Sequence, residues 1–194
     1  MKHITLFLIL IFGSFLTMQA QYCTPSGSGG NGAFLGEICF PTVANPFTNC
    51  NQTNAGGNYG DFTGSGSRGT YAPTASGQIT NQVLVGVDRT NAGDYTFAVY
   101  VDLNQDQVFS HPSEQLASGS GNISFGTGGR ASFTETLTIP TSATNGVTRM
   151  RVIAQNGTTP VTDPCATGFN GEPEDYLITI TGAGATGSCD IAID

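Results

Sequence analysis

The sequence predicts an all-β fold, an antiparallel sandwich of two sheets with a jelly-roll-like or immunoglobulin-like topology. Three observations lead to this prediction. Glycine, serine, threonine and asparagine are abundant, while charged residues make up only 10% of the chain, a composition typical of β-proteins. No stretch beyond the first twenty residues shows the three-to-four spacing of apolar residues that marks an amphipathic helix. Several segments instead alternate apolar and polar residues, with turn signals at intervals suited to a sandwich.

The N-terminus has the features of a secretory signal peptide. Lys2 and His3 precede an apolar run from Ile4 to Leu16, and the small residue Ala20 follows, so we expect cleavage after Ala20. No later apolar stretch approaches the ~20 residues that a membrane-spanning helix needs. The chain is therefore divided into a signal peptide (1–20), one β-sandwich domain (21–182) and a flexible tail or linker (183–194), with no membrane span in the mature protein.

Charge and cysteine content narrow the class of protein further. Beyond Ala20 the chain has five arginines, no lysine and 14 acidic residues, a formal charge of −9, which disfavours nucleic acid and anionic lipid as partners. Export favours disulfides, so we expect two bridges and one remaining cysteine, in a pairing that spacing does not reveal. A zinc site is the rival interpretation, disfavoured because there is no CxxC pair and His111 is the only mature histidine. The cysteines are Cys23, Cys39, Cys50, Cys165 and Cys189.

The first part of the mature chain is expected to be loop-rich. Residues 24–36 and 51–70 are rich in glycine, serine and asparagine, with short apolar pieces such as 38–40 between them, and we interpret them as long loops that carry weak strands. Stronger strand signals begin at Gln82. Strands are predicted at 83–87, 95–103, 132–140, 146–155 and 174–182.

Alternation within two of these strands predicts which side chains face the core. In 95–103, Tyr95, Phe97, Val99 and Val101 share one face. In 146–155, Thr148, Met150 and Val152 face one way, while Arg149 and Arg151 share the other face.

The segment VDLNQDQVFSHPSE, which follows the second predicted strand, is a candidate calcium loop. Asp102, Asn104 and Asp106 fall at alternate positions, as in the first half of an acidic calcium loop, where every second residue supplies an oxygen ligand. The backbone carbonyl of Val108 and the carboxylate of Glu114 can complete the shell. Gln107 stands where such loops have glycine, and a left-handed backbone there costs about 1 kcal/mol, which metal binding can offset. The alternative is an acidic turn with solvated charges.

A second group of acids precedes the last predicted strand. Glu172, Glu174 and Asp175 either add ligands to the same cation, with Asp175 the candidate for this role, or pair with Arg149 and Arg151 on a neighbouring strand, as exposed cross-strand pairs do. We favour the arginine pairing for Glu174 and leave both interpretations open for Asp175.

Several ordered motifs resemble the GEVED domain, a family named after its GEVEDY motif and found in secreted, often multidomain bacterial proteins. The matching stretches are YCTPSGSGGNG (22–32), VYVDLNQDQVF (99–109), TIPTSATNGVTRMRV (138–152), Pro164-Cys165 and GEPEDYLITI (171–180). Three positions depart from the family pattern: Leu103 replaces tryptophan, Gln107 replaces glycine and Pro173 replaces valine. The resemblance implies a β-sandwich accessory module, stabilised by calcium, that is extracellular or displayed on the bacterial cell surface.

The residues favour a binding or structural module over an enzyme. No nucleophile elbow, zinc-protease motif or second mature histidine accompanies His111, so no catalytic residues are assigned. Paired carboxylates could serve a glycosidase, but the chain lacks tryptophan for a sugar platform. We expect a non-catalytic, calcium-stabilised module for surface adhesion, with a glycan or a cell-surface protein as partner. The alternative is a calcium-assisted carbohydrate-binding module, with Tyr59, Tyr71, Tyr100 and Asn104 as candidate sugar contacts.

Overall fold

The computed structural model describes residues 21–28, 33–40, 49–52, 58–73, 81–124 and 129–184. The predicted signal peptide, Cys189 and most of the predicted tail lie outside these ranges.

One sheet of the sandwich contains six strands, in the order β4-β12-β10-β7-β8, with β5 pairing alongside β12. Its long strands are antiparallel to their neighbours. The two short strands pair parallel to β12 on either side of a 3-10 turn, Thr63–Ser65. The strands are β4 (Gly60–Asp61), β5 (Ser67–Tyr71), β7 (Gly93–Val101), β8 (Gln115–Ile123), β10 (Gly146–Asn156) and β12 (Gly171–Ile180).

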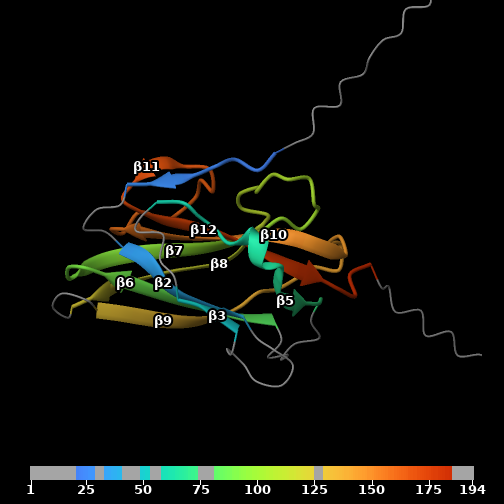
Figure 1. The fold of residues 1–194 in the computed structure, drawn as a ribbon, viewed down its shortest axis with the longest axis horizontal. Coiled ribbons are helices and arrows are strands. Elements are labelled where there is room, and N and C mark those ends of the chain that lie inside the picture. The colour runs from blue at the N-terminus through green and yellow to red at the C-terminus, as the bar shows by residue number, and fades with distance from the viewer. Residues whose placement is uncertain are drawn as a thin grey trace, which may run out of the picture.

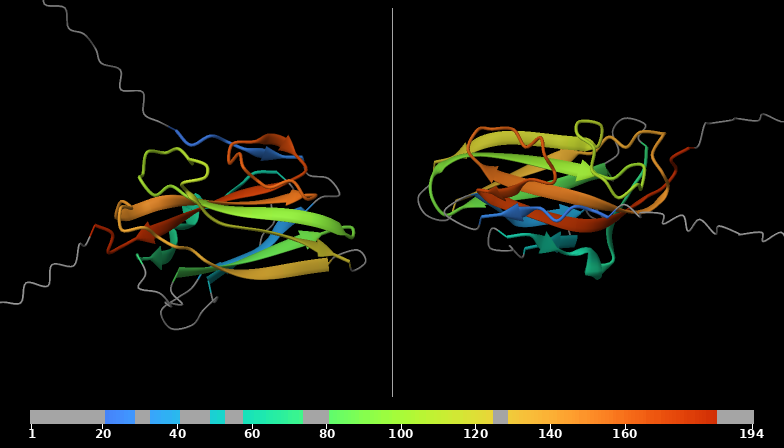
Figure 2. Two further views of the ribbon diagram at one scale, coloured as in Figure 1. Left: turned by 180° about the vertical axis from the view of Figure 1, so that it is seen from behind. Right: turned by 90° about the horizontal axis from the view of Figure 1, so that it is seen from above.

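The second sheet has four antiparallel strands, in the order β3-β2-β6-β9. It packs face to face against the six-stranded sheet, as Figures 1 and 2 show. Its strands are β2 (Ala33–Phe40), β3 (Asn49–Asn51), β6 (Gln82–Arg89) and β9 (Gly129–Thr136). The predicted all-β, two-sheet sandwich is therefore confirmed.

The main core lies between the two sheets and follows the predicted alternation. Tyr95, Phe97, Val99 and Val101 of β7 are at most 2% exposed and belong to this core, as do Met150 and Val152 of β10. Arg149 and Arg151, at the intervening positions, lie on the outer face of the same sheet.

A third, smaller layer covers that outer face. The N-terminal segment contributes β1 (Ser26–Gly27), which pairs in parallel with β11 (Thr167–Phe169), and Figure 1 shows both strands stacked over the six-stranded sheet. A second apolar cluster fills the space beneath and contains Ala98, Tyr100, Phe109, Ile153 and Val161, with Tyr22 and Phe169 packed against it. The centre of the six-stranded sheet is consequently buried on both faces.

The structure changes the bounds of several predicted elements and adds strands that were not predicted, among them β8 and β11. The short apolar piece at 38–40 belongs to the eight-residue strand β2, and the predicted strand at 132–140 ends at Thr136. Strand β8, with the sequence QLASGSGNI, was not predicted. The predicted disulfides form between Cys23 and Cys165 and between Cys39 and Cys50. Across the described ranges, no helix has the length and apolarity to cross a membrane.

Candidate functional site

The acidic loop, which we define as residues 102–114, connects β7 to β8 and is fixed at its base by β10. The carbonyl of Asp102 accepts a hydrogen bond from Thr148 Oγ1 (2.6 Å), and its amide donates to the carbonyl of Arg149 (3.0 Å). Gln105 and Gln107 have φ angles of 59° and 68°. Gln107 therefore has the left-handed backbone predicted for the position where calcium loops carry glycine.

Asp102 is the buried residue of this loop. Its side chain is 0% exposed. Oδ2 accepts hydrogen bonds from the Gln107 amide (3.0 Å) and from the hydroxyl of Tyr22. Oδ1 is buried and has no partner among the described residues. A buried carboxylate oxygen without a donor is costly, and a cation is one means of satisfying it.

Asn104 and Asp106 are exposed and bond to each other and to the loop backbone. The Asn104 amide group donates to Asp106 Oδ2 (2.8 Å), and the Asp106 backbone amide donates to Asn104 Oδ1 (3.0 Å). Asp106 Oδ1 in turn accepts from the Val108 amide (2.8 Å). These are Asx-type turns, which give the loop a defined shape.

Glu114 closes the loop from its far end and is 4% exposed. Its two carboxylate oxygens accept the amides of Leu103 and Ser110, each at 2.8 Å. Burial raises the pKa of Glu114, the two backbone bonds lower it, and the charges of Asp102 and Asp106 raise it further. The three acids of the loop therefore repel one another, and a bound cation would relieve that repulsion.

The loop contains five of the six predicted ligands, but its carboxylates do not converge on one point. Among the described residues, Glu37, Cys39 and Cys50 are the group whose possible metal-ligand atoms lie within 4.8 Å of one another. The sulfur atoms of Cys39 and Cys50 are joined in a disulfide. The carboxylates of Asp102, Asp106 and Glu114 are not drawn together in this way. Cation binding would thus require the exposed side chains of Asn104 and Asp106 to turn toward Asp102.

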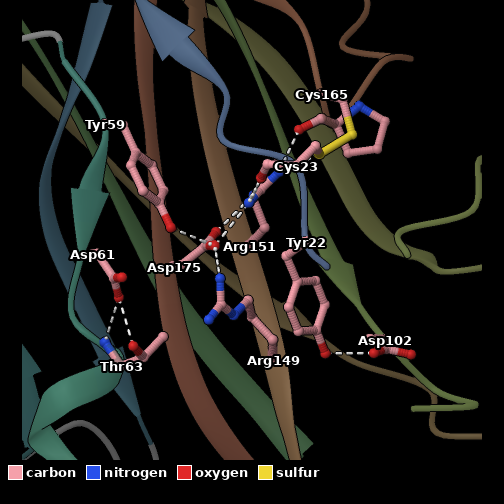
Figure 3. Close-up of polar contacts among 11 residues, drawn as sticks. Tyr22, Cys23, Tyr59, Asp61, Thr63, Asp102, Arg149, Arg151, Cys165 and Asp175 are labelled. Atoms are coloured by element: carbon pink, nitrogen blue, oxygen red, sulfur yellow. Dashed lines mark hydrogen bonds and ion pairs between the residues drawn. A yellow bond between two sulfur atoms is a disulfide. The ribbon is translucent and has the colours of Figure 1, made fainter. Parts of the chain in front are cut away.

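The structure places the sixth predicted ligand, Asp175, in an arginine cluster on the outer face of the six-stranded sheet (Figure 3). Asp175 is 0% exposed. Arg151 donates to both of its oxygens (2.6 and 2.7 Å), Arg149 donates at 3.0 Å, and the Tyr59 hydroxyl donates at 2.8 Å. Asp175 therefore follows the arginine-pairing interpretation, and its charge is compensated within this cluster.

Glu174 does not pair with the arginines, so that part of the prediction is wrong. Strand register explains why: Arg151 lies opposite Asp175, while Glu174 lies opposite Val152 and faces the core. Glu174 Oε2 accepts from the Tyr176 hydroxyl (2.5 Å), and Oε1 has no partner among the described residues. Glu172, on the same face, accepts the Leu35 amide of the opposite sheet at 2.8 Å.

Tyr22 is the site residue that the sequence did not reveal. Its hydroxyl reaches Asp102 across 80 positions of sequence, its ring packs on Phe109 at 5.3 Å, and the Arg149 guanidinium lies over it at 4.2 Å. Burial raises the pKa of Tyr22, as does its bond to Asp102, so the hydroxyl keeps its proton and donates. The sequence signals for this segment were the adjacent Cys23, a predicted disulfide partner, and the family-like stretch 22–32 that begins with Tyr22.

The tyrosines considered for sugar binding are engaged elsewhere. Tyr71 and Tyr100 are 0% exposed, and the Tyr59 hydroxyl is bonded to Asp175. A hollow of about 230 Å³ does lie beside the acidic loop, without an aromatic residue in its described lining. Its lining includes Leu103, Asn104, Ser113, Glu114, Pro140 and Ser142.

Comparison with known families matches part of the chain. Residues 96–179 match the family model of the GEVED domain, a range that begins in β7, includes the acidic loop and ends in β12. A search of curated proteins found no match to the chain.

Proposed function

We propose that this chain, whose residues 96–179 match the GEVED domain family, is a non-catalytic extracellular module. Its acidic loop would be stabilised by calcium, and the module would serve surface adhesion or accompany an exported protein. The module would hold its adhesive or accessory surface rigid outside the cell, where calcium is abundant. Asp102, Asn104, Asp106, Glu114 and the carbonyl of Val108 are the groups that would hold the ion.

One observation carries the calcium proposal: Asp102 Oδ1 is fully buried and has no partner among the described residues. Gln107 and Tyr22 occupy the other oxygen of the same carboxylate. In acidic calcium loops the first aspartate supplies an oxygen ligand, and the sixth position makes the sharp turn. The free Oδ1 and the left-handed Gln107 correspond to these two roles.

The charges of the molecule support a module that binds through its acidic surface. The mature chain has 14 acidic residues against five arginines, and three of the arginines already form ion pairs with acids, so the surface charge is negative overall and would favour a basic or cation-bridged partner. The ion pairs join Arg130 to Asp88 and both Arg149 and Arg151 to Asp175, while Arg68 donates to the side-chain oxygen of Asn49 and Arg89 to the carbonyl of Asn91.

Thermal unfolding of the mature chain with EDTA or with millimolar calcium tests the ion. At a calcium concentration a hundredfold above the dissociation constant, we expect stabilisation by about 2.7 kcal/mol. Asp102→Asn and, separately, the exposed Asp106→Asn should abolish or weaken this gain, and titration calorimetry should show the same loss.

The matched control is Asp94→Asn, an exposed aspartate at the other end of β7 that bonds to Asn122 at 2.7 Å. It should respond to calcium as the wild type does. If the wild type melts identically in EDTA and in calcium, or if Asp94→Asn loses as much as Asp106→Asn, the loop is not the calcium site.

The hollow beside Asn104 and Glu114 favours a second candidate, calcium-assisted carbohydrate binding. A glycan array probed with and without calcium tests it. Calcium-dependent glycan binding that Ser142→Trp blocks, while calcium affinity is unchanged, would support this alternative. Binding that ignores calcium, or no binding at all, would reject it.

A further inference from the structure

The N-terminal strap, residues 21–28, is fastened across the outer face of the six-stranded sheet at two adjacent residues. Cys23 is joined to Cys165. The carbonyl of Cys23 accepts a hydrogen bond from Arg151 Nη2 at 2.8 Å, and Arg151 Nη1 donates to the carbonyl of Pro164 at 2.8 Å. One buried guanidinium thus holds both sides of the disulfide in place.

Tyr22, the residue before this disulfide, is the direct hydrogen-bond donor to Asp102 (Figure 3). Its hydroxyl and the Gln107 amide both bond to Oδ2, which orients the carboxylate and leaves Oδ1 free. Groups that orient a metal ligand in this way commonly change metal affinity by about 10- to 100-fold when removed.

We propose that the strap is a covalently fastened outer shell of the calcium site, in which Tyr22 positions Asp102 and the Cys23–Cys165 disulfide positions Tyr22. This inference rests on the proposed calcium function. Disulfide closure then raises calcium affinity, and by thermodynamic reciprocity calcium favours the closed disulfide by the same factor. A secreted module would acquire its full calcium affinity only after the strap is free to dock and its cysteines are oxidised.

Calcium titration of the mature chain with matched tyrosine variants tests the positioning role. Tyr22→Phe removes the hydroxyl that bonds to Asp102, and we expect it to weaken calcium binding about tenfold. Tyr59→Phe is the control, because Tyr59 is equally half-buried but donates to Asp175; its affinity should stay within about twofold of wild type. Equal losses in the two variants, or none in Tyr22→Phe, would overturn the positioning role.

The Cys23→Ser, Cys165→Ser double variant tests the covalent step. It should lose about as much affinity as Tyr22→Phe, and adding Tyr22→Phe to it should cost little more, because the two changes disturb one contact. Additive losses would show that the disulfide and Tyr22 act separately. Hydrogen exchange of residues 21–28 should increase in the double variant even without calcium, a readout that reports strap docking on its own.

Reciprocity supplies a readout on the sulfur atoms. Dithiothreitol transfers two protons and two electrons from its thiols to the S–S bond, which gives two cysteine thiols and the cyclic oxidised reagent. Calcium should shift this equilibrium about tenfold toward the Cys23–Cys165 disulfide and leave Cys39–Cys50, the internal control, unchanged. If the wild type binds no calcium, the proposed function fails; if it binds calcium but neither Tyr22 nor the disulfide alters the affinity, only the strap inference fails.

Discussion

At the scale of single residues, Glu174 is a carboxyl group buried in the core. It is 1% exposed, and its pKa is raised to about 9, mainly by burial. The charge of Glu172 raises this pKa further, whereas the hydrogen bond from the Tyr176 hydroxyl lowers it. The Tyr176 oxygen also accepts from the Asn51 amide group at 2.9 Å. Glu174 is consequently neutral in the native protein at pH 7, while in the unfolded chain it is ionised.

This difference predicts a pH dependence with a definite sign. Between the unfolded pKa of 4.5 and the native value of about 9, the native state binds the proton that the unfolded state has lost, so stability falls as pH rises. Glu174→Gln keeps the neutral form. Its stability relative to wild type should therefore increase by up to ~1.4 kcal/mol per pH unit across this window.

Urea unfolding in EDTA at several pH values measures this gain. Glu135→Gln, the same change at a partly exposed position of β9, should show a much smaller pH dependence. A wild type whose stability is flat from pH 5 to pH 9, with Glu174→Gln parallel to it, would contradict the assignment of a neutral buried Glu174.

At the scale of elements, β12 shows how register distributes chemistry between two faces. Glu172, Glu174 and Tyr176 face the core, whereas Asp175, between them, faces the arginines. Gly171 begins the strand where it runs tightly against β10: a Cβ atom at this position would overlap the carbonyl oxygen of Ala154. The first residue of the GEPEDY motif is thus glycine for a steric reason.

Gly171→Ala should accordingly destabilise the protein by about 1 to 3 kcal/mol, the usual cost of overpacking. The clash involves backbone, so a side-chain rotation cannot relieve it. Gly64→Ala is the control, because a Cβ there meets nothing within 4 Å, and it should change stability by no more than about 0.5 kcal/mol. Equal urea midpoints for the two variants would refute the steric reason.

The side chains that each strand turns toward the core explain which strands could be predicted from the sequence. Alternation identified β7 and β10 because most of their inward residues are apolar. Strand β8 escaped because its inward positions include Gly119 and Gly121, whose Cβ atoms would run into the rings of Phe97 and Tyr95 on the neighbouring strand. The rings of β7 fill the space above these two glycines, so the sequence of β8 does not show alternating apolar residues.

The site residues that lie close together in the sequence could be predicted. Asp102, Asn104, Asp106 and Glu114 were found from spacing within one loop. Glu174 was misassigned because an acid was expected to pair with an arginine, although residues two positions apart on a strand share a face and Glu174 is two positions before Tyr176, which lies in the core. Tyr22 could not be found, since no local pattern records a contact made only after the strap crosses the sheet.

At the scale of the whole molecule, the two disulfides close covalent loops of very different size. Cys23–Cys165 has a sequence separation of 142, and Cys39–Cys50 a separation of 11. Constraint of the unfolded chain grows with loop length, to about 5 kcal/mol for the long loop and about 3 kcal/mol for the short one. In EDTA, Cys23→Ser with Cys165→Ser should thus lower stability more than Cys39→Ser with Cys50→Ser.

Chemical unfolding of the two double-serine variants without calcium checks this ordering. The comparison excludes the contribution of the ion and isolates the effect of the cross-link on the chain. A larger loss from the Cys39–Cys50 pair would mean that local packing between β2 and β3, rather than loop length, determines the value of a disulfide in this fold.

The Cys23–Cys165 bond also determines how the module would bear tension. A force applied at Cys23 and Gly184 passes through the sulfur atoms to Cys165 and bypasses the residues between the two cysteines. Only the segment from Cys165 to Gly184 remains in the path, which at ~3.4 Å per residue can lengthen to about 65 Å. Strand β12 lies in that segment and is paired with β10 from Gly171 to Ile180. The disulfide therefore confines extension under load to the segment that contains β11 and β12, and it keeps the residues between Cys23 and Cys165 out of the force path.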